Sequence, residues 1–272
     1  MTIALRKAGV GPENVDFILA GDLLNQCISS TFGLMDFQIP FLGQYGACST
    51  MAQTLFMATI LVESGAAEKA LAVTSSHFCS AERQFRLPLE YGGQRSPTAQ
   101  WTATASGCVL VGTGGPVEIR RGLAGKIQDL GVKDPANMGA AMAPAAASSI
   151  FEFLEDTHTR PEDYDGIFTG DLGLVGSRLL YECMDDNGID LRPVHQDCGL
   201  LLYDRERQDV HAGGSGCGCS AGVLCGHLLR QMEKGELKNI LFCATGALMS
   251  PTSQQQGLAI PGVCHVVQLV AK

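Results

Sequence analysis

The sequence predicts an α/β fold made of two similar halves, in which two mixed sheets alternate with layers of helices in the order αβαβα. Three observations favour this class. Segments of the first half recur in the second, and apolar strand-like segments alternate with helical ones in each copy. Of the 272 residues, 46% are hydrophobic and 17% charged, which suffices for a large core. We therefore expect two pseudo-symmetric domains, residues 1–115 and 116–272.

The first repeated element is a short apolar strand that runs into a Gly-Asp-Leu turn. It occurs at residues 14–23 as NVDFILAGDL and again at residues 163–172 as DYDGIFTGDL. Because the repeat is long and both copies end in the same three letters, we expect Asp22 and Asp171 to occupy equivalent places in the two halves.

The second repeated element is a cysteine at the start of a helix that is followed by an apolar strand. In the first half the helix begins at GACS (46–49) and ends near Gly65, and in the second it begins at GCSA (218–221) and ends near Gly235. The expected strands are Ala70–Thr74 and Ile240–Ala244. This order of elements is typical of a mostly parallel sheet covered by helices.

The second half also contains elements that the first lacks. A strand at Val117–Arg121 and a helix at Met142–Thr157 precede the second copy of the Asp-rich strand, whereas the first copy is preceded only by a short helical segment, Thr2–Lys7. We therefore expect the first half to lack a leading strand and part of one helix.

Composition narrows the classes of function. The formal net charge of −9 argues against a nucleic-acid surface. No apolar stretch approaches the ~20 residues of a membrane-spanning helix, and we find no secretion signal. The eleven cysteines are scattered through apolar segments, so we expect reduced thiols in a cytosol-like compartment.

Cys48 is the first candidate for chemistry. The segment around it, YGACSTM (45–51), places a thiol at a sharp turn from strand to helix. A helix N-terminus lowers the pKa of a thiol and binds anions, so the same place suits an acyl thioester or a bound carboxylate. The alternative is that Cys48 is a small buried apolar residue.

Two turns of the second half should meet at the same cavity. They are residues 170–173, with Asp171, and residues 213–220, with Ser215. Neither contains a histidine, which argues against catalysis. His195 lies past the position where a catalytic histidine would stand, and we interpret it as structural.

Two motifs are rejected as cofactor or metal sites, and we expect neither a cofactor nor a metal. Cys217 and Cys219 form a C-x-C pair with no second pair at ligand spacing, which argues against zinc. GTGG at 112–115 is followed by a proline and a strand rather than a helix, which argues against a dinucleotide site.

An insert at residues 76–105 has no counterpart of similar length in the second half. It contains His77, Arg83, Arg86 and the only tryptophan, Trp101. Such an insert more often serves a ligand or an oligomer contact, the alternative being a solvated lid. His77 could donate to a ligand carboxylate or satisfy a backbone carbonyl.

The duplicated halves with a cysteine at the turn resemble the thiolase superfamily, which includes thiolases and β-ketoacyl synthases. Cys48 matches the acyl-accepting cysteine of that superfamily. The resemblance implies two activating side chains from the second half, usually histidines or a His/Asn pair. Asp171 and Ser215 stand at those places, so the catalytic pattern is absent at both.

Longer segments resemble the sporulation branch of this superfamily, the stage V AD family. They are residues 20–26, 74–77, 81–86, 90–94, 142–147 and 244–248. The resemblance implies a non-catalytic protein that binds dipicolinic acid (pyridine-2,6-dicarboxylate), alone or as its calcium chelate, for uptake into the developing spore. It further implies membrane-protein partners of the same channel system, a homodimer, and a peripheral place at the spore inner membrane.

In that family Asp22 and Cys48 match residues associated with the pocket. The ligand is a dianion, so the helix start at Cys48, His77, Arg83 and Arg86 could contribute to binding it. Asp22 would repel a bare carboxylate unless it contacts calcium, is protonated, or accepts a hydrogen bond from a water. Two alternatives stay open. One is a Cys48-dependent acyltransferase or condensing enzyme that uses Asp171, Ser215 or His77, and the other is a scaffold with a vestigial pocket.

Overall fold

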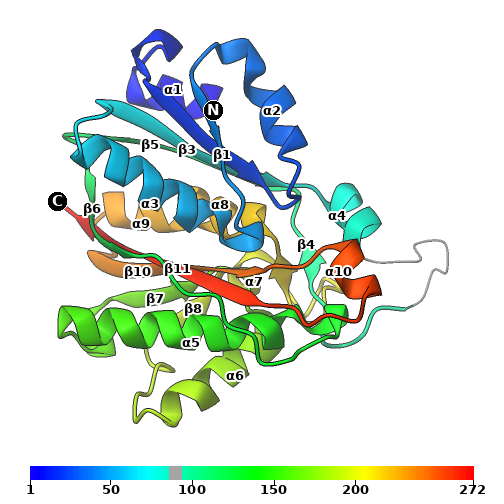
Figure 1. Ribbon diagram of the computed structural model, residues 1–272. Coiled ribbons are helices and arrows are strands. Elements are labelled where there is room, and N and C mark those ends of the chain that lie inside the picture. Colours follow the sequence, from blue (N-terminus) through cyan, green and yellow to red (C-terminus); the bar gives the residue numbers. More distant parts are fainter. Residues whose placement is uncertain (86–93) are drawn as a thin grey trace.

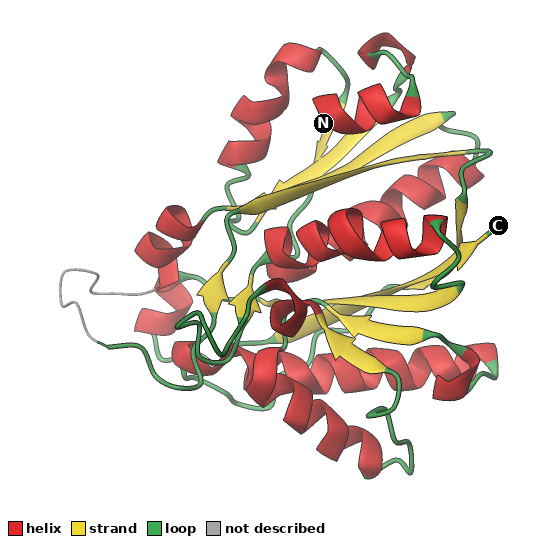
Figure 2. Cartoon of the chain, turned by 180° about the vertical axis from the view of Figure 1, so that it is seen from behind, coloured by secondary structure: helices red, strands yellow, loops and turns green. Residues whose placement is uncertain are grey.

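The fold is a five-layered α/β arrangement, as predicted (Figure 1). The computed structural model describes residues 1–85 and 94–272. Two large sheets lie one above the other, with helices between them and on both outer faces. The view from behind shows the same layers (Figure 2).

The first sheet has four strands in the order β2-β1-β3-β5. Strands β2 and β3 run parallel to β1, and β5 runs antiparallel to β3. Asp22, at the end of β1, is in register with Ser75 near the end of β3. The strands are Phe17–Asp22 (β1), Phe41–Gly43 (β2), Lys69–Ser76 (β3) and Ala105–Gly112 (β5).

The second sheet has five strands in the order β6-β11-β10-β7-β8. Its three strands β10, β7 and β8 are parallel, and β11 is antiparallel to both of its neighbours. The arrangement repeats that of the first sheet, with one more strand. The strands are Val117–Leu123 (β6), Gly166–Thr169 (β7), His195–Asp197 (β8), Asn239–Ala247 (β10) and Gly262–Ala271 (β11).

The central layer contains the two helices that follow the repeated cysteines. Helix α3 (Thr50–Glu63) follows a 3-10 turn at Ala47–Ser49, and the helix of the second half begins as α8 at Cys217–Val223. That second helix is not uniform, because a π-helical turn at Leu224–Leu228 separates α8 from α9 (Leu229–Glu233). Apolar side chains of both helices and both sheets form one core cluster that includes Met51, Leu224 and Phe242.

Helices also cover the outer faces. Helix α5 (Met138–Thr157) packs on β10 and β11, and it begins four residues earlier than predicted. The remaining helices are short and lie on the outer faces or in connections. They are α1 (Thr2–Ala8), α2 (Ile28–Leu34), α4 (Phe78–Phe85), α6 (Gly173–Asp185), α7 (Cys198–Leu202), α10 (Pro251–Gln255) and 3-10 turns at Pro12–Asn14, Met35–Phe37, Pro135–Asn137 and Pro161–Asp163. None of the helices in the described ranges is long and apolar enough to cross a bilayer.

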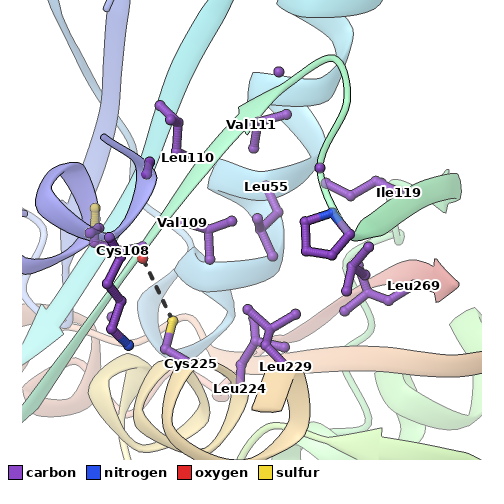
Figure 3. Close-up of a pocket in the computed structure, with 18 of the residues that line it drawn as sticks. Leu55, Cys108, Val109, Leu110, Val111, Ile119, Leu224, Cys225, Leu229 and Leu269 are labelled. Carbon is purple, nitrogen blue, oxygen red and sulfur yellow. Dashed lines mark hydrogen bonds between the residues drawn. The ribbon is translucent and has the colours of Figure 1, made fainter. Parts of the chain in front are cut away.

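Strand β5 forms a free edge of the first sheet among the described residues. In the second half, β6 pairs with the outer edge of β11, but no strand of the described residues pairs with the corresponding edge of β5. A pocket of about 790 Å³ lies there, lined by apolar side chains of both halves (Figure 3). They include Leu55, Val109, Leu110, Ile119, Leu229 and Leu269.

Candidate functional site

Asp171 is the centre of a buried polar cluster at the end of β7. Its carboxylate accepts hydrogen bonds from the backbone N–H of Gly216 (2.7 Å), the hydroxyl of Thr245 (3.0 Å) and the hydroxyl of Ser215 (3.2 Å). The side chain is fully buried. The structure therefore brings the two turns of the second half together, with Asp171 and Ser215 in direct contact.

Cys48 reaches this cluster from the first half. It lies in the 3-10 turn before α3, where the preceding residue, Ala47, has a φ of 50°. The thiol lies beside the Asp171 carboxylate, close enough for each group to shift the pKa of the other. Apolar contacts with Leu23, Ala81 and Cys217 enclose it, so that only 4% of Cys48 is exposed.

The pKa of the Cys48 thiol lies well above its ordinary value. Burial is the largest cause, and the charge of Asp171 and its hydrogen bond to the thiol add to the rise. The sequence-based prediction of a lowered pKa is therefore wrong. It counted the backbone dipole at the helix start, but burial and the negative charge of the neighbouring Asp171 favour the neutral thiol.

Burial also raises the pKa of Asp171, while the hydrogen bonds that it accepts from Cys48, Gly216, Thr245 and Ser215 act in the opposite direction. Burial thus raises the pKa of both the thiol and the carboxyl group of this cluster, and hydrogen bonds oppose the rise mainly at the carboxyl group.

Asp22 is the last residue of β1 and Asp171 follows β7 by two residues, but the contacts of the two aspartates differ. Its carboxylate accepts hydrogen bonds from the hydroxyl (2.6 Å) and backbone N–H (3.1 Å) of Ser30, and from the hydroxyl of Ser75 (3.3 Å). Cys217 lies between the two aspartates. Burial raises the pKa of Cys217 to about 12, and both aspartate charges add to the rise.

A second buried network supports the Asp171 turn. Asp197 accepts hydrogen bonds from the backbone N–H groups of Leu172 (2.8 Å) and Gly173 (3.0 Å), and from the hydroxyl of Thr169 (2.7 Å). The same hydroxyl lies 2.8 Å from Nε2 of His195. His195 thus packs behind the turn rather than at the thiol.

The structure describes two of the three insert residues that were predicted to contribute to ligand binding. His77 and Arg83 are exposed, directly before α4 and on that helix. Arg86 lies outside the described residues. Gln100 donates to the backbone carbonyls of Asp171 and Gly214, both at 2.7 Å.

Residues 94–102 bind the second half through backbone pairing. Strand β4 (Trp101–Thr102) pairs in parallel with β9 (Gly214–Ser215). Arg95 stacks over Trp101 and forms an ion pair with Glu82 of α4. The described part of the insert therefore forms one wall of the site.

Sequence reasoning missed Thr245, Asp197, Gln100 and the Arg95–Glu82 pair. Thr245 could have been found from the repeat, because Ser75 holds the same place in the first half, in register with Asp22, and donates to its carboxylate. The others come from segments without a repeat counterpart, and their partners are distant in sequence.

Comparison with known proteins decides the family. The family model for stage V sporulation protein AD matches residues 1–270. The stage V sporulation protein AD of Bacillus subtilis (strain 168) is 46% identical over 268 residues, which cover 98% of this chain and 79% of the relative. The chain belongs to the stage V sporulation protein AD family. Membership establishes a sporulation role, and it agrees with the resemblance found in the sequence.

Solved structures outside the family share the fold. The 3-oxoacyl-[acyl-carrier-protein] synthase III of Aquifex aeolicus VF5 matches 98% of this chain and 80% of its own, with 16% identity and a TM-score of 0.60. A single-substitution variant of OleA from Xanthomonas campestris matches 99% and 78%, with 14% identity and a TM-score of 0.65. At these identities the likeness shows a thiolase-like fold and nothing of the chemistry.

Gly246, next to Thr245, sets how closely β10 approaches the turn that carries Cys48. A Cβ atom there would lie 2.3 Å from the carbonyl oxygen of Gly46 and 3.1 Å from the backbone N–H nitrogen of Ser49. We expect Gly246→Ala to lower the free energy of unfolding by about 2 kcal/mol, since backbone must move to admit the methyl group. Chemical denaturation monitored by circular dichroism measures this. Gly226→Ala, where a Cβ meets nothing within 4 Å, is the matched control, and equal stability of the two variants would contradict the prediction.

Proposed function

We propose that this protein binds dipicolinic acid at the site around Cys48 and Asp171 without turning it over, as part of its uptake into the developing spore. The observation that carries the proposal is the enclosed Cys48 thiol beside the buried carboxylate of Asp171, in a member of a sporulation family. The fold is thiolase-like, but burial and the neighbouring carboxylate favour the protonated form of its cysteine.

A condensing enzyme needs the opposite arrangement. Its cysteine attacks as a thiolate, and neighbouring donors stabilise the oxyanion that follows. Asp171 accepts hydrogen bonds and repels negative charge, so it opposes both the thiolate and the oxyanion. This supports binding over acyl transfer.

A site for this ligand must stabilise its negative charge. Dipicolinate is a dianion at neutral pH, and both Asp22 and Asp171 are buried carboxylates near Cys217. A calcium ion that arrives with the ligand as its chelate, or a cationic side chain, would offset this repulsion. In the described part of the chain no cluster of three or more His, Cys, Asp or Glu side chains is placed to hold a metal by itself.

The site is tested by calorimetric titration of the protein with dipicolinate, with and without calcium. We expect saturable binding by the wild type and about tenfold or greater weakening in Cys48→Ala and Asp22→Ala, because both residues belong to the enclosed cluster or its polar border. Cys183→Ala and the exposed Asp36→Ala are matched controls. A folded wild type that does not bind dipicolinate in either condition contradicts the proposal, and labelling of Cys48 by acyl-CoA would then favour the condensing enzyme.

The family also supports a homodimer that acts with membrane proteins at the spore inner membrane. The short edge strand β2 of the first sheet is exposed, with Phe41 at 40% and Leu42 at 41%, which suits pairing between two copies. Analytical ultracentrifugation checks the dimer, and a monomer at micromolar concentration would contradict it.

A further inference from the structure

A dianion at this site needs a cationic partner, and the described residues offer few. Of the lysines and arginines in residues 1–85 and 94–272, only Lys69 and Arg95 are not exposed. Lys69 begins β3, whereas the site lies at the other end of that strand, beside Ser76. Arg95 is therefore the cation to consider, and this inference rests on the proposed function.

Arg95 is held rigidly. Its side chain is only 6% exposed. The guanidinium carbon lies 3.5 Å from the centre of the Trp101 ring and 5.4 Å from that of Phe78, and Nη1 donates to the carbonyl of Gln100 at 2.9 Å. Stacking and this hydrogen bond fix the plane of the guanidinium, which is the condition for two-point binding of a carboxylate.

The segment that holds Arg95 is bound to the Asp171 cluster. Gln100 accepts from Arg95 through its backbone and donates to the carbonyl of Asp171 through its side chain. The next two residues pair with Gly214 and Ser215. The segment that carries Arg95 thus forms part of the wall of the proposed site.

The Arg95 guanidinium is already paired with a carboxylate of this chain. Glu82 of α4 forms an ion pair with Nη2 of Arg95, and its side chain is 11% exposed. The neighbouring residue, Ala81, packs against Cys48. The turn of α4 that covers the thiol is therefore the turn that brings a carboxylate to Arg95.

We propose that Arg95 receives a carboxylate group of the ligand and that Glu82 takes its place in the unliganded protein. Exchange of one carboxylate for the other keeps the buried guanidinium paired in both states, which avoids the penalty of an unpaired buried charge. Because Glu82 lies on α4, the exchange also releases a contact that ties this helix to residues 94–102.

The two partners of the ion pair give opposite results in a calorimetric titration with dipicolinate. Glu82→Gln removes the competing charge, so we expect about tenfold tighter binding, whereas Arg95→Gln removes the receptor and weakens binding about tenfold or more. If the pair only fastens α4, both substitutions break the same contact and shift the affinity in the same direction. That result would overturn the proposal.

A second ligand makes the test independent of α4. Pyridine-2-carboxylate lacks one carboxylate, and we expect the preference of the wild type for dipicolinate to fall about tenfold in Arg95→Gln. Arg95→Lys, which keeps the charge but not the planar fork, should lie between, and it replaces Arg95→Gln if that variant does not fold by circular dichroism. Arg178→Gln, an exposed arginine on α6, is the control. An unchanged preference in a folded Arg95 variant contradicts this inference alone, while a folded wild type that binds neither ligand contradicts the proposed function.

Discussion

Asp171→Asn is expected to make Cys48 react with iodoacetamide about 10- to 1000-fold faster at pH 8. The substitution keeps the shape of the side chain but removes the charge that opposes the thiolate, and a nearby charge commonly changes a pKa by one to three pH units, about tenfold in thiolate per unit. Burial still raises the pKa of Cys48 in the variant, so the thiol remains less acidic than an ordinary one. Peptide mapping by mass spectrometry measures the rate at Cys48 separately from the other ten cysteines.

Asp22→Asn is the matched control for this experiment. It makes the same chemical change at the equivalent place of the first half, but Asp22 is not among the groups that raise the pKa of Cys48. We expect the labelling rate at Cys48 to change less than threefold. If Asp171→Asn folds and labels no faster than the wild type, Asp171 does not hold the thiol in its protonated form.

The result bears on the proposed function, because it tests whether the site opposes a thiolate in this thiolase-like fold. The nucleophile position is kept, and the side chains at the two activating positions are Asp171 and Ser215, which contact each other. Asp171 accepts hydrogen bonds where the catalytic pattern of the superfamily has a cationic donor. A thiolate at Cys48 is therefore not stabilised by this position, and the turn keeps its shape.

The duplicated fold could be predicted because the repeat carries both the strand order and the turns. Asp171 and Ser215 were found from motifs alone, since strand-end turns of the two halves must meet when the halves are stacked. The pKa of Cys48 could not be predicted, because its main causes are burial and a contact across the two halves. Rules that consider only the start of a helix include neither the burial of the thiol nor a contact with the other half of the chain.

The sequence could not tell which arginines of the insert are enclosed by the fold. Arg83, which was predicted to contribute to ligand binding, lies exposed on α4, while the side chain of Arg95 is enclosed by Trp101 and Glu82. Both residues are arginines in a polar segment, and nothing in their neighbours along the chain distinguishes them. Only the pairing of β4 with β9 brings one of them against the site.

The buried pair behind the Asp171 turn should give this protein an acid response that a single substitution reveals. Burial lowers the pKa of His195 to about 4 and raises that of Asp197 to about 6. Protonation of His195 favours the unfolded chain, so its contribution to stability is lost as the pH falls from 6.5 to about 4. Asp197 binds its proton more tightly in the folded chain, so its contribution is present at low pH and is lost as the pH rises through about 6. Each shift corresponds to about 3 kcal/mol, and in the window between pH 6.5 and 4 the two largely cancel.

His195→Gln separates the two contributions, because glutamine can still bond to Thr169 and Tyr181 but takes up no proton. We expect the free energy of unfolding of the variant, relative to the wild type, to rise by about 3 kcal/mol between pH 7 and pH 4, since only the loss due to His195 is removed. Urea denaturation at a series of pH values measures the difference, and His227→Gln, at an exposed histidine of the π-helical turn, is the matched control. A difference that stays constant across this range would mean that His195 is not held neutral by burial, and the network behind Asp171 would then have to admit water.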